Sequence, residues 1–271
     1  MKRSLFAILI IFLLAFKLQA QELFTFSEPA SNMPANSLGI RVNNWLMNDP
    51  EANKINYHMV PELMWGVNKN FMGHAEAFIS NRDKGLSVEG AAFYGKYRFY
   101  SNDDVYRHFR IAAYGRVSAN SAVIHQDEIN INGHNSGVEA GMIVTQLAHK
   151  QAFSATVGYV KAVPNASGND FPASGATSGV NVFLSTGRLI LPRKYNSYKQ
   201  TNFNVMFEVI GQYQPKTEKY YFDVGPSLQF IFNSQARIDI AYRRSLLTNM
   251  DRTAPNGMFI RLEYLFFNPF K

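Results

Sequence analysis

The segment RHFRIAAYGRVSA, residues 107–119, decides the fold class, because apolar and polar side chains alternate along it. Phe109 and Val117 fall on one face of an extended chain, whereas Arg110 and Arg116 fall on the other. Successive side chains of a β-strand point to opposite faces. The segment is therefore predicted to be a strand with one apolar face and one charged face.

Eleven further segments show the same alternation, so the chain is predicted to be all-β, with about 12 strands and with 10 or 14 as the alternatives. Many of these segments are longer than the roughly 5 to 6 residues of an average soluble strand. Length therefore favours a single antiparallel transmembrane β-barrel over a soluble exported β-sandwich. The expected spans are 36–46, 56–67, 71–80, 86–100, 107–119, 135–148, 151–162, 177–191, 199–213, 219–232, 235–246 and 257–267.

The links between these strands alternate in length, as in barrels with short periplasmic turns and longer surface loops. Tight turns are expected at 68–70, 149–150 and 233–234. The longer links 120–134 and 163–176 are rich in Asn, Gly, Ser and Pro and are expected to face outward from the cell. An even strand number then puts both chain ends on the periplasmic side.

The first 20 residues predict export, because a basic start at Lys2 and Arg3 precedes an apolar run that ends before Ala20. Cleavage is expected after Ala20, and residues 21–35 are interpreted as either a periplasmic extension or a short plug, ahead of a barrel at 36–271. Later residues contain no apolar run of about 18 residues, which excludes a helical membrane protein.

The composition excludes several kinds of site and partner. The chain has no cysteine, which excludes disulfides, thiolate metal sites and cysteine nucleophiles. Its formal charge of +7 includes three signal-peptide residues, and the remaining basic residues are scattered among carboxylates, so no nucleic-acid partner is expected. With 22 Phe, 14 Tyr and only 17% charged residues, much of the surface is expected to be apolar or to face lipid.

The last predicted strand, MFIRLEYLFF at 258–267, alternates an apolar face with Arg261 and Glu263. It resembles the C-terminal assembly signal of bacterial outer-membrane β-barrel proteins. That resemblance implies the outer membrane as the location and the barrel-assembly machinery as a partner. The family usually ends on the final aromatic residue, whereas this chain continues to Lys271.

Charged residues on the strands are expected to face the lumen, because charges on the lipid face are costly. Hairpin register predicts that Glu62 lies opposite Glu76, that Lys96 lies near Arg110 and that Arg98 lies near His108, giving an acidic patch beside a basic one. The candidates for lining and selectivity are Arg41, Glu62, His74, Glu76, Lys96, Arg98, Arg110, Arg116, Glu139, Glu208, Asp223, Arg237, Asp239, Arg243, Arg261 and Glu263.

His58, Met64, Met72 and His74 lie on neighbouring predicted strands and point inward by parity, and His with Met is a ligand set that suits a soft metal. Their spacing forms no recognised ligand motif. Ordinary lumen and gap-filling residues are the favoured interpretation, so no metal and no cofactor are predicted.

His134 and Ser136 form a His-x-Ser pair at the start of a predicted strand, which would place both side chains on one face, toward lipid. The pair resembles the catalytic motif of outer-membrane phospholipase A and of lipid A deacylases. The following residues, Val138–Met142, lack the polar and Arg-containing run of the phospholipase motif, and no third member occurs near Ala148. A chance pairing is favoured, and the sequence establishes no enzyme.

The function favoured by the sequence is a channel or transporter-like barrel for a small polar solute, with the charged lumen residues setting selectivity. Two alternatives remain open. One is a lipid hydrolase that uses His134 and Ser136, and the other is a closed structural or binding barrel that acts through its surface loops 120–134 and 163–176. The oligomeric state is left open.

Overall fold

The computed structural model describes residues 24–49, 53–82, 85–104, 107–124, 126–166, 175–194, 197 and 199–269. The predicted signal peptide lies outside these residues. Across the described ranges, no helix is long and apolar enough to cross a membrane.

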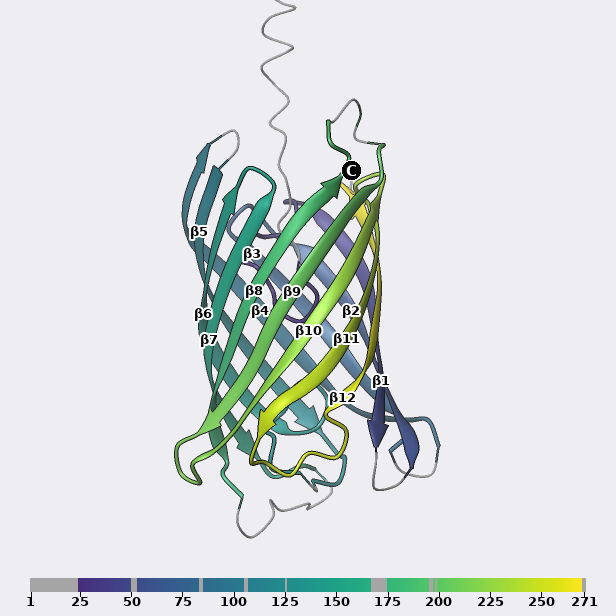
Figure 1. Ribbon diagram of the computed structural model, residues 1–271, viewed down its shortest axis with the longest axis vertical. Coiled ribbons are helices and arrows are strands. Elements are labelled where there is room, and N and C mark those ends of the chain that lie inside the picture. The colour runs from purple at the N-terminus through teal and green to yellow at the C-terminus, as the bar shows by residue number, and fades with distance from the viewer. Residues whose placement is uncertain are drawn as a thin grey trace, which may run out of the picture.

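The chain forms one closed antiparallel barrel of twelve strands, as predicted (Figure 1). Each strand pairs with its neighbours in sequence, and β1 pairs with β12 in a ladder that runs from Ser37↔Phe267 to Asn48↔Asn256. The strands are β1 Ser37–Asp49, β2 Lys54–Gly66, β3 Phe71–Ser80, β4 Ser87–Asp104, β5 Arg107–Asn120, β6 Ser136–Ala148, β7 Gln151–Val163, β8 Ser178–Leu191, β9 Asn202–Gln214, β10 Lys219–Phe232, β11 Ala236–Thr248 and β12 Asn256–Phe267.

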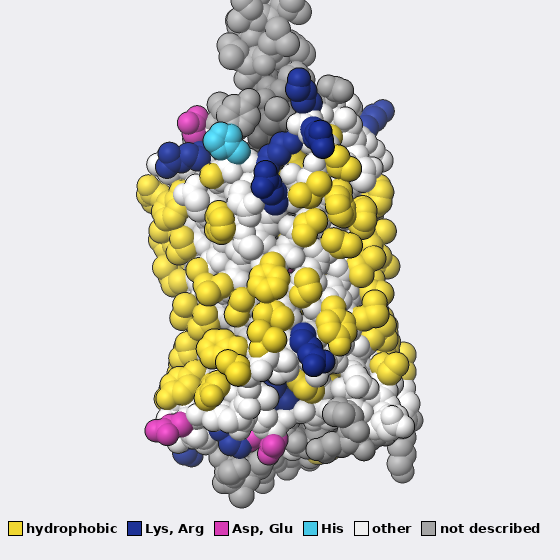
Figure 2. Space-filling view, viewed as in Figure 1, with side chains coloured by type: hydrophobic (Ala, Val, Ile, Leu, Met, Phe, Trp, Pro, Cys, Tyr) yellow, Lys and Arg dark blue, Asp and Glu magenta, His cyan; other side chains and the backbone are white. Residues whose placement is uncertain are grey.

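The alternation along each strand separates an apolar outer face from a polar lumen. On β12, Leu262 and Tyr264 are 49% and 43% exposed, whereas Arg261 and Glu263 are buried inside the barrel. Figure 2 shows hydrophobic side chains over much of the visible wall, with most Lys and Arg near its two ends. An exposed apolar band with a polar interior is the arrangement of a barrel that contacts lipid.

Many large exposed aromatic side chains lie toward the strand ends, where they flank the apolar band as interfacial girdles do, whereas Phe93 and Phe207 lie near the middle of their strands. Those near the end that carries the chain termini are Tyr97, Phe99, Tyr100, Phe153, Phe266 and Phe267, and those toward the other end are Tyr159, Tyr213, Tyr220 and Phe222.

The lumen is occupied by two parts of the chain that are not strands. Residues 24–36, here called the lumenal segment, contact inward side chains of the wall before β1 begins. Residues 121–135, here called the inward loop, connect β5 to β6 and bury Ile129 and Ile131 against β7. The prediction that the whole 120–134 link faces outward is wrong for these central residues, because their apolar side chains pack inside the barrel.

The expected register between β4 and β5 is also wrong. Strand β4 continues to Asp104, so Lys96 pairs with Tyr114 and Arg98 pairs with Ala112. The sequence predicts a link at 101–106, whereas residues 101–104 extend the ladder with β5. Asp103 therefore binds Arg110, and the expected stack of like charges does not form. The expected pairing of Glu62 with Glu76 is confirmed.

We expect Leu184→Arg, in the middle of β8 and 52% exposed, to destabilise the barrel by about 2–4 kcal/mol, because it places a charge at the centre of the apolar band. Leu247→Arg, near the end of β11 and 62% exposed, is the matched control and should cost about 0–1 kcal/mol. Urea unfolding in lipid vesicles measures both. Equal losses would show that the band does not sit in hydrocarbon as described.

Candidate functional site

The lumenal segment is held most directly by the Glu208 carboxylate on β9. It accepts hydrogen bonds from the backbone N–H groups of Thr25, Phe26 and Ser27 at 2.7, 2.8 and 3.0 Å. The hydroxyls of Ser27 and Ser185 donate to the same carboxylate at 2.8 and 2.9 Å. Five hydrogen bonds therefore converge on one side chain and hold the segment against β9.

Phe26 fits against the wall where a glycine leaves room. A Cβ at Gly225 would lie 2.2 Å from the Phe26 ring, so the close approach requires glycine at this position. The ring packs with its centroid 5.6 Å from that of Trp45 and 5.5 Å from that of Phe259. The segment is therefore seated by both polar and aromatic contacts.

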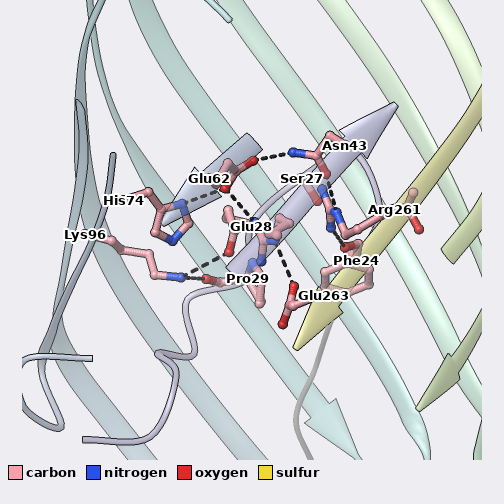
Figure 3. A network of polar contacts seen from close by, with 12 residues as sticks. Phe24, Ser27, Glu28, Pro29, Asn43, Glu62, His74, Lys96, Arg261 and Glu263 are labelled. Carbon is pink, nitrogen blue, oxygen red and sulfur yellow. Dashed lines mark hydrogen bonds and ion pairs between the residues drawn. The ribbon is translucent and has the colours of Figure 1, made fainter. Parts of the chain in front are cut away.

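Ion pairs hold the next part of the segment, at Glu28 (Figure 3). Its carboxylate accepts from Arg41 Nη1 at 2.6 Å and lies 3.7 Å from Lys96 Nζ. Arg41 also donates to Glu263 at 2.8 Å. Burial alone would raise the pKa of Glu28, but the charges of Arg41 and Lys96 outweigh it and hold that pKa well below its ordinary value.

Backbone carbonyls of the segment are bound by cations of the wall. Lys96 donates to the carbonyls of Pro29 and Ser31 at 2.6 and 2.8 Å. Arg237 and Arg261 both donate to the carbonyl of Phe24, at 2.7 and 3.1 Å. Wall cations thus satisfy carbonyl groups that lie outside any ladder.

The inward loop is held by a second ionic cluster, nearer the opposite end. Glu128 accepts from Arg252 at 2.6 Å and from Arg243 at 3.4 Å, and Arg252 binds both oxygens of Asp223 at 2.8 and 2.7 Å. The Arg252 guanidinium also lies 3.9 Å from the centroid of the Tyr221 ring. Burial would raise the pKa of Glu128, but Arg252 and Arg243 lower it to about 2.

Polar contacts on both sides of Glu128 continue this attachment. The Asp127 carboxylate accepts from Lys219 Nζ at 2.5 Å, and its backbone carbonyl accepts from Gln214 at 2.7 Å. The side chain of Gln212 accepts from Ile129 N at 3.0 Å and donates to Ile129 O at 2.8 Å. Side chains of the wall therefore hold the backbone of the loop at Asp127 and Ile129.

A chamber of about 160 Å³ lies between the lumenal segment and the inward loop. The segment contributes Phe26 to Glu28, and the loop contributes Glu128 to Asn132. On the side of the chain termini, a gap of about 30 Å³ lies beside Glu28, Arg41 and Met64. The wall side chains around the chamber are Trp45, Tyr94, Tyr114, Arg116, Glu139, Ile143, Thr156, Asn181, Phe183, Ile210, Tyr221 and Arg243.

Most of the sequence-predicted lumen residues lie in these networks, although their role in selectivity stays a prediction. Arg98 lies near the β2–β3 turn and donates to the carbonyl of Lys69 at 2.7 Å. Arg116 binds Glu76, and Tyr114 donates to Glu139 at 2.6 Å. The buried members are Arg41, Glu62, His74, Glu76, Lys96, Arg110, Glu208, Asp223, Arg237, Asp239, Arg243, Arg261 and Glu263.

Sequence reasoning missed the partners that these residues bind outside the strands. These partners lie on the lumenal segment or on loops, where the alternation of side chains along a strand predicts no orientation. They are Glu28, Asp127, Glu128 and Arg252. One signal was present in the run DEINI at 127–131, which alternates charged or polar residues with isoleucines inside a link otherwise read as a solvent-facing loop.

The residues considered for metal binding are arranged differently from the expected set. Within the described parts of the chain, Glu62, His74 and Glu76 offer ligand atoms that lie within 4.8 Å of one another. Arg41 binds Glu62 at 3.3 Å and Arg116 binds Glu76, so two guanidinium groups already compensate both carboxylates. A metal ion would have to displace them.

The His-x-Ser residues are enclosed by loop contacts. Ser136 is buried, donates to the Asn120 carbonyl at 3.1 Å and accepts from the Asn120 N–H at 2.8 Å. The Nδ1 atom of His134 lies 2.5 Å from Arg82 Nη1. The expectation that Ser136 faces lipid is wrong, because residues of neighbouring loops cover it.

No protein-family model matches the chain, and no curated protein matches it. Among solved structures, it is similar to the COG4313 outer membrane channel from Pseudomonas putida F1, with a TM-score of 0.58 and 11% identity over 90% of this chain and 100% of that one. Salmonella typhi OmpF aligns with a TM-score of 0.36 and 9% identity over 85% of this chain and 97% of that one. The resemblance expected from the sequence is confirmed at the level of the fold.

Acid should release the inward loop. The pKa of Glu128 falls from an ordinary 4.5 to about 2 on folding, so its stabilising effect is complete above about pH 4.5 and is lost as the pH falls toward 2. Because the chain has no cysteine, Val123→Cys provides a single position on the loop for an environment-sensitive dye. We expect its emission to change between pH 5 and pH 2 and to recover on neutralisation.

The variant Glu128→Gln is the control for this titration. It removes the titrating carboxylate, so the dye should report a looser loop at neutral pH and a smaller change on acidification. Circular dichroism checks that the barrel remains folded throughout. Identical emission of the labelled parent protein at pH 7 and pH 2 would contradict the assigned role of Glu128.

Proposed function

We propose that this protein is an outer-membrane channel for small polar solutes that is closed in this conformation by the lumenal segment and the inward loop. The observation that carries the proposal is the way in which the lumen is obstructed. Two segments that are not part of the wall fill a polar lumen, and hydrogen bonds and ion pairs attach them to it. A solved structure with a similar fold is itself an outer membrane channel.

The wall does not depend on these two segments for closure. Its ladder is completed by β1 and β12, which pair from Ser37 to Asn48. Pairing between strands therefore continues around the whole wall without a free edge, as a barrel needs in hydrocarbon. The segments can leave the lumen without opening an edge in the wall.

The interior favours small polar solutes. Most of its charged side chains lie in ion pairs, as Arg243 with Asp223 and Arg237 with Asp239 illustrate. A nearly balanced set of fixed charges gives little long-range attraction for an ion of either sign. Selectivity then depends on the local charges exposed when the segments move.

The proposed location follows from the same arrangement. The chain termini and the tight turns at 67–70, 149–150 and 233–235 share one end of the barrel, which is assigned to the periplasm. Cleavage after Ala20 would leave the lumenal segment close to the new N-terminus. The C-terminal strand β12 is the proposed contact for the barrel-assembly machinery, and outer-membrane lipid surrounds the apolar band.

Planar-bilayer conductance tests the proposal. The lumenal segment and the inward loop obstruct the same path in series, so loosening one leaves the other in place. We expect Glu208→Ala or Asp127→Ala alone to raise the open probability modestly over the parent protein. The double variant should raise conductance by more than the sum of the two single effects.

Glu218→Gln is the matched control, because Glu218 is an exposed carboxylate in the β9–β10 turn, outside both clusters. Its conductance should equal that of the parent protein. Folding of every variant is checked by resistance of the barrel to detergent at room temperature. A folded double variant that never conducts would refute the channel and leave a closed structural barrel as the better description.

A further inference from the structure

We propose that the central chamber is a binding site for a neutral, polyhydroxylated solute of monosaccharide size. The inference rests on the proposed function, since it names the class of solute that the channel would take. It is carried by three features of the chamber: hydroxyl groups without partners, aromatic side chains in its lining, and charges that are already compensated.

Two buried hydroxyls line the chamber and have no hydrogen-bond partner among the described residues. They are Tyr94 Oη on β4 and Thr156 Oγ1 on β7, in side chains that are 3% and 5% exposed. A buried polar group without a partner costs free energy, and most such groups are satisfied by protein, water or a ligand. Hydroxyls both donate and accept, so they suit a ligand that is itself hydroxylated.

Aromatic rings supply the apolar part of the site. Tyr94 and Tyr114 stack with their ring centroids 5.7 Å apart, and Phe26 lies against Trp45 on the lumenal segment side. Small-molecule sites combine such apolar surfaces with a few placed polar groups. A sugar ring presents both kinds of surface, with C–H groups on its faces and hydroxyls around its edge.

The charged groups around the chamber favour a neutral solute. Glu28 is bound by Arg41, and Glu128 is bound by Arg252. Glu139 accepts the Tyr114 hydroxyl and lies opposite Arg116 in the β5–β6 ladder. A charged ligand would leave part of its own charge desolvated, since the nearby opposite charges are already engaged.

The volume sets the size of the solute. At about 160 Å³, the chamber is smaller than the roughly 300–1,000 Å³ of sites for drug-sized ligands. It holds several waters or one small organic molecule. An oligosaccharide would require the inward loop or the lumenal segment to leave.

Tryptophan fluorescence provides a direct binding assay. The chain has two tryptophans, and Trp45 lines the chamber whereas Trp65 packs against Phe93, whose side chain is 48% exposed on the outer face. Trp65→Phe therefore leaves Trp45 as the reporter. We expect hexoses or pentoses to change its emission saturably, while choline and benzoate at equal concentration should have weaker effects.

The double variant Tyr94→Phe/Thr156→Val, made in the Trp65→Phe background, should bind the same sugar at least about tenfold more weakly, because two hydrogen bonds are lost. Tyr97→Phe is the matched control on the outer face, where Tyr97 is 50% exposed, and should bind unchanged. To ensure access to the chamber, the titration is repeated with Glu208→Ala, which loosens the lumenal segment without lining the chamber.

Three results would overturn the inference. The first is that no hexose or pentose gives a saturable response in either the Trp65→Phe protein or its Glu208→Ala form. The second is that the double variant binds the sugar with the same affinity as the Trp65→Phe protein. The third is that choline or benzoate binds more strongly than every sugar. Binding and conductance are scored separately. A barrel that conducts without binding sugar disproves only the chamber assignment, whereas one that binds sugar without conducting disproves only the channel.

Discussion

The rest of this structure depends on the requirement that backbone N–H and C=O groups have partners where no water is present. The ladder between β1 and β12 meets it, because it removes the last free edges of a twelve-stranded sheet. Closure also creates two environments on the two faces of every strand. The outer face must be apolar, so residues such as Arg261 and Glu263 can lie only inside.

An enclosed lumen makes its charges depend on one another. Removing the partner of a buried charge is strongly destabilising, so the interior consists of linked groups and few isolated ones. Glu28 and Glu128 extend this linkage from the wall to the lumenal segment and to the inward loop. The same electrostatic constraint that organises the wall thus also closes the barrel.

These attachments differ in kind from the wall. The strands share continuous backbone ladders, whereas the lumenal segment and the inward loop are held largely by side chains such as Glu208, Gln212 and Arg252. Local regions with fewer shared contacts open at lower free energy than the core of a fold. A permanent wall with separable internal segments is a physical basis for a channel that opens without unfolding, and it leaves a chamber between the two obstructions.

The sequence by itself predicted about twelve strands, the face of each strand and the identity of most lumen charges, because the period of two is a local property of an extended chain. The closed twelve-stranded ladder then excluded the alternatives of 10 and 14 strands. It did not determine the pairing of Lys96 or Arg98, since register depends on where the hairpin turns. Nor did it place Glu28 and Glu128, which lie outside the predicted strands, or Ser136, which lies at the start of one. Only the tertiary structure decided their partners, because Arg41, Arg252 and Asn120 lie far from them in sequence or on other elements and meet them only once the barrel has closed.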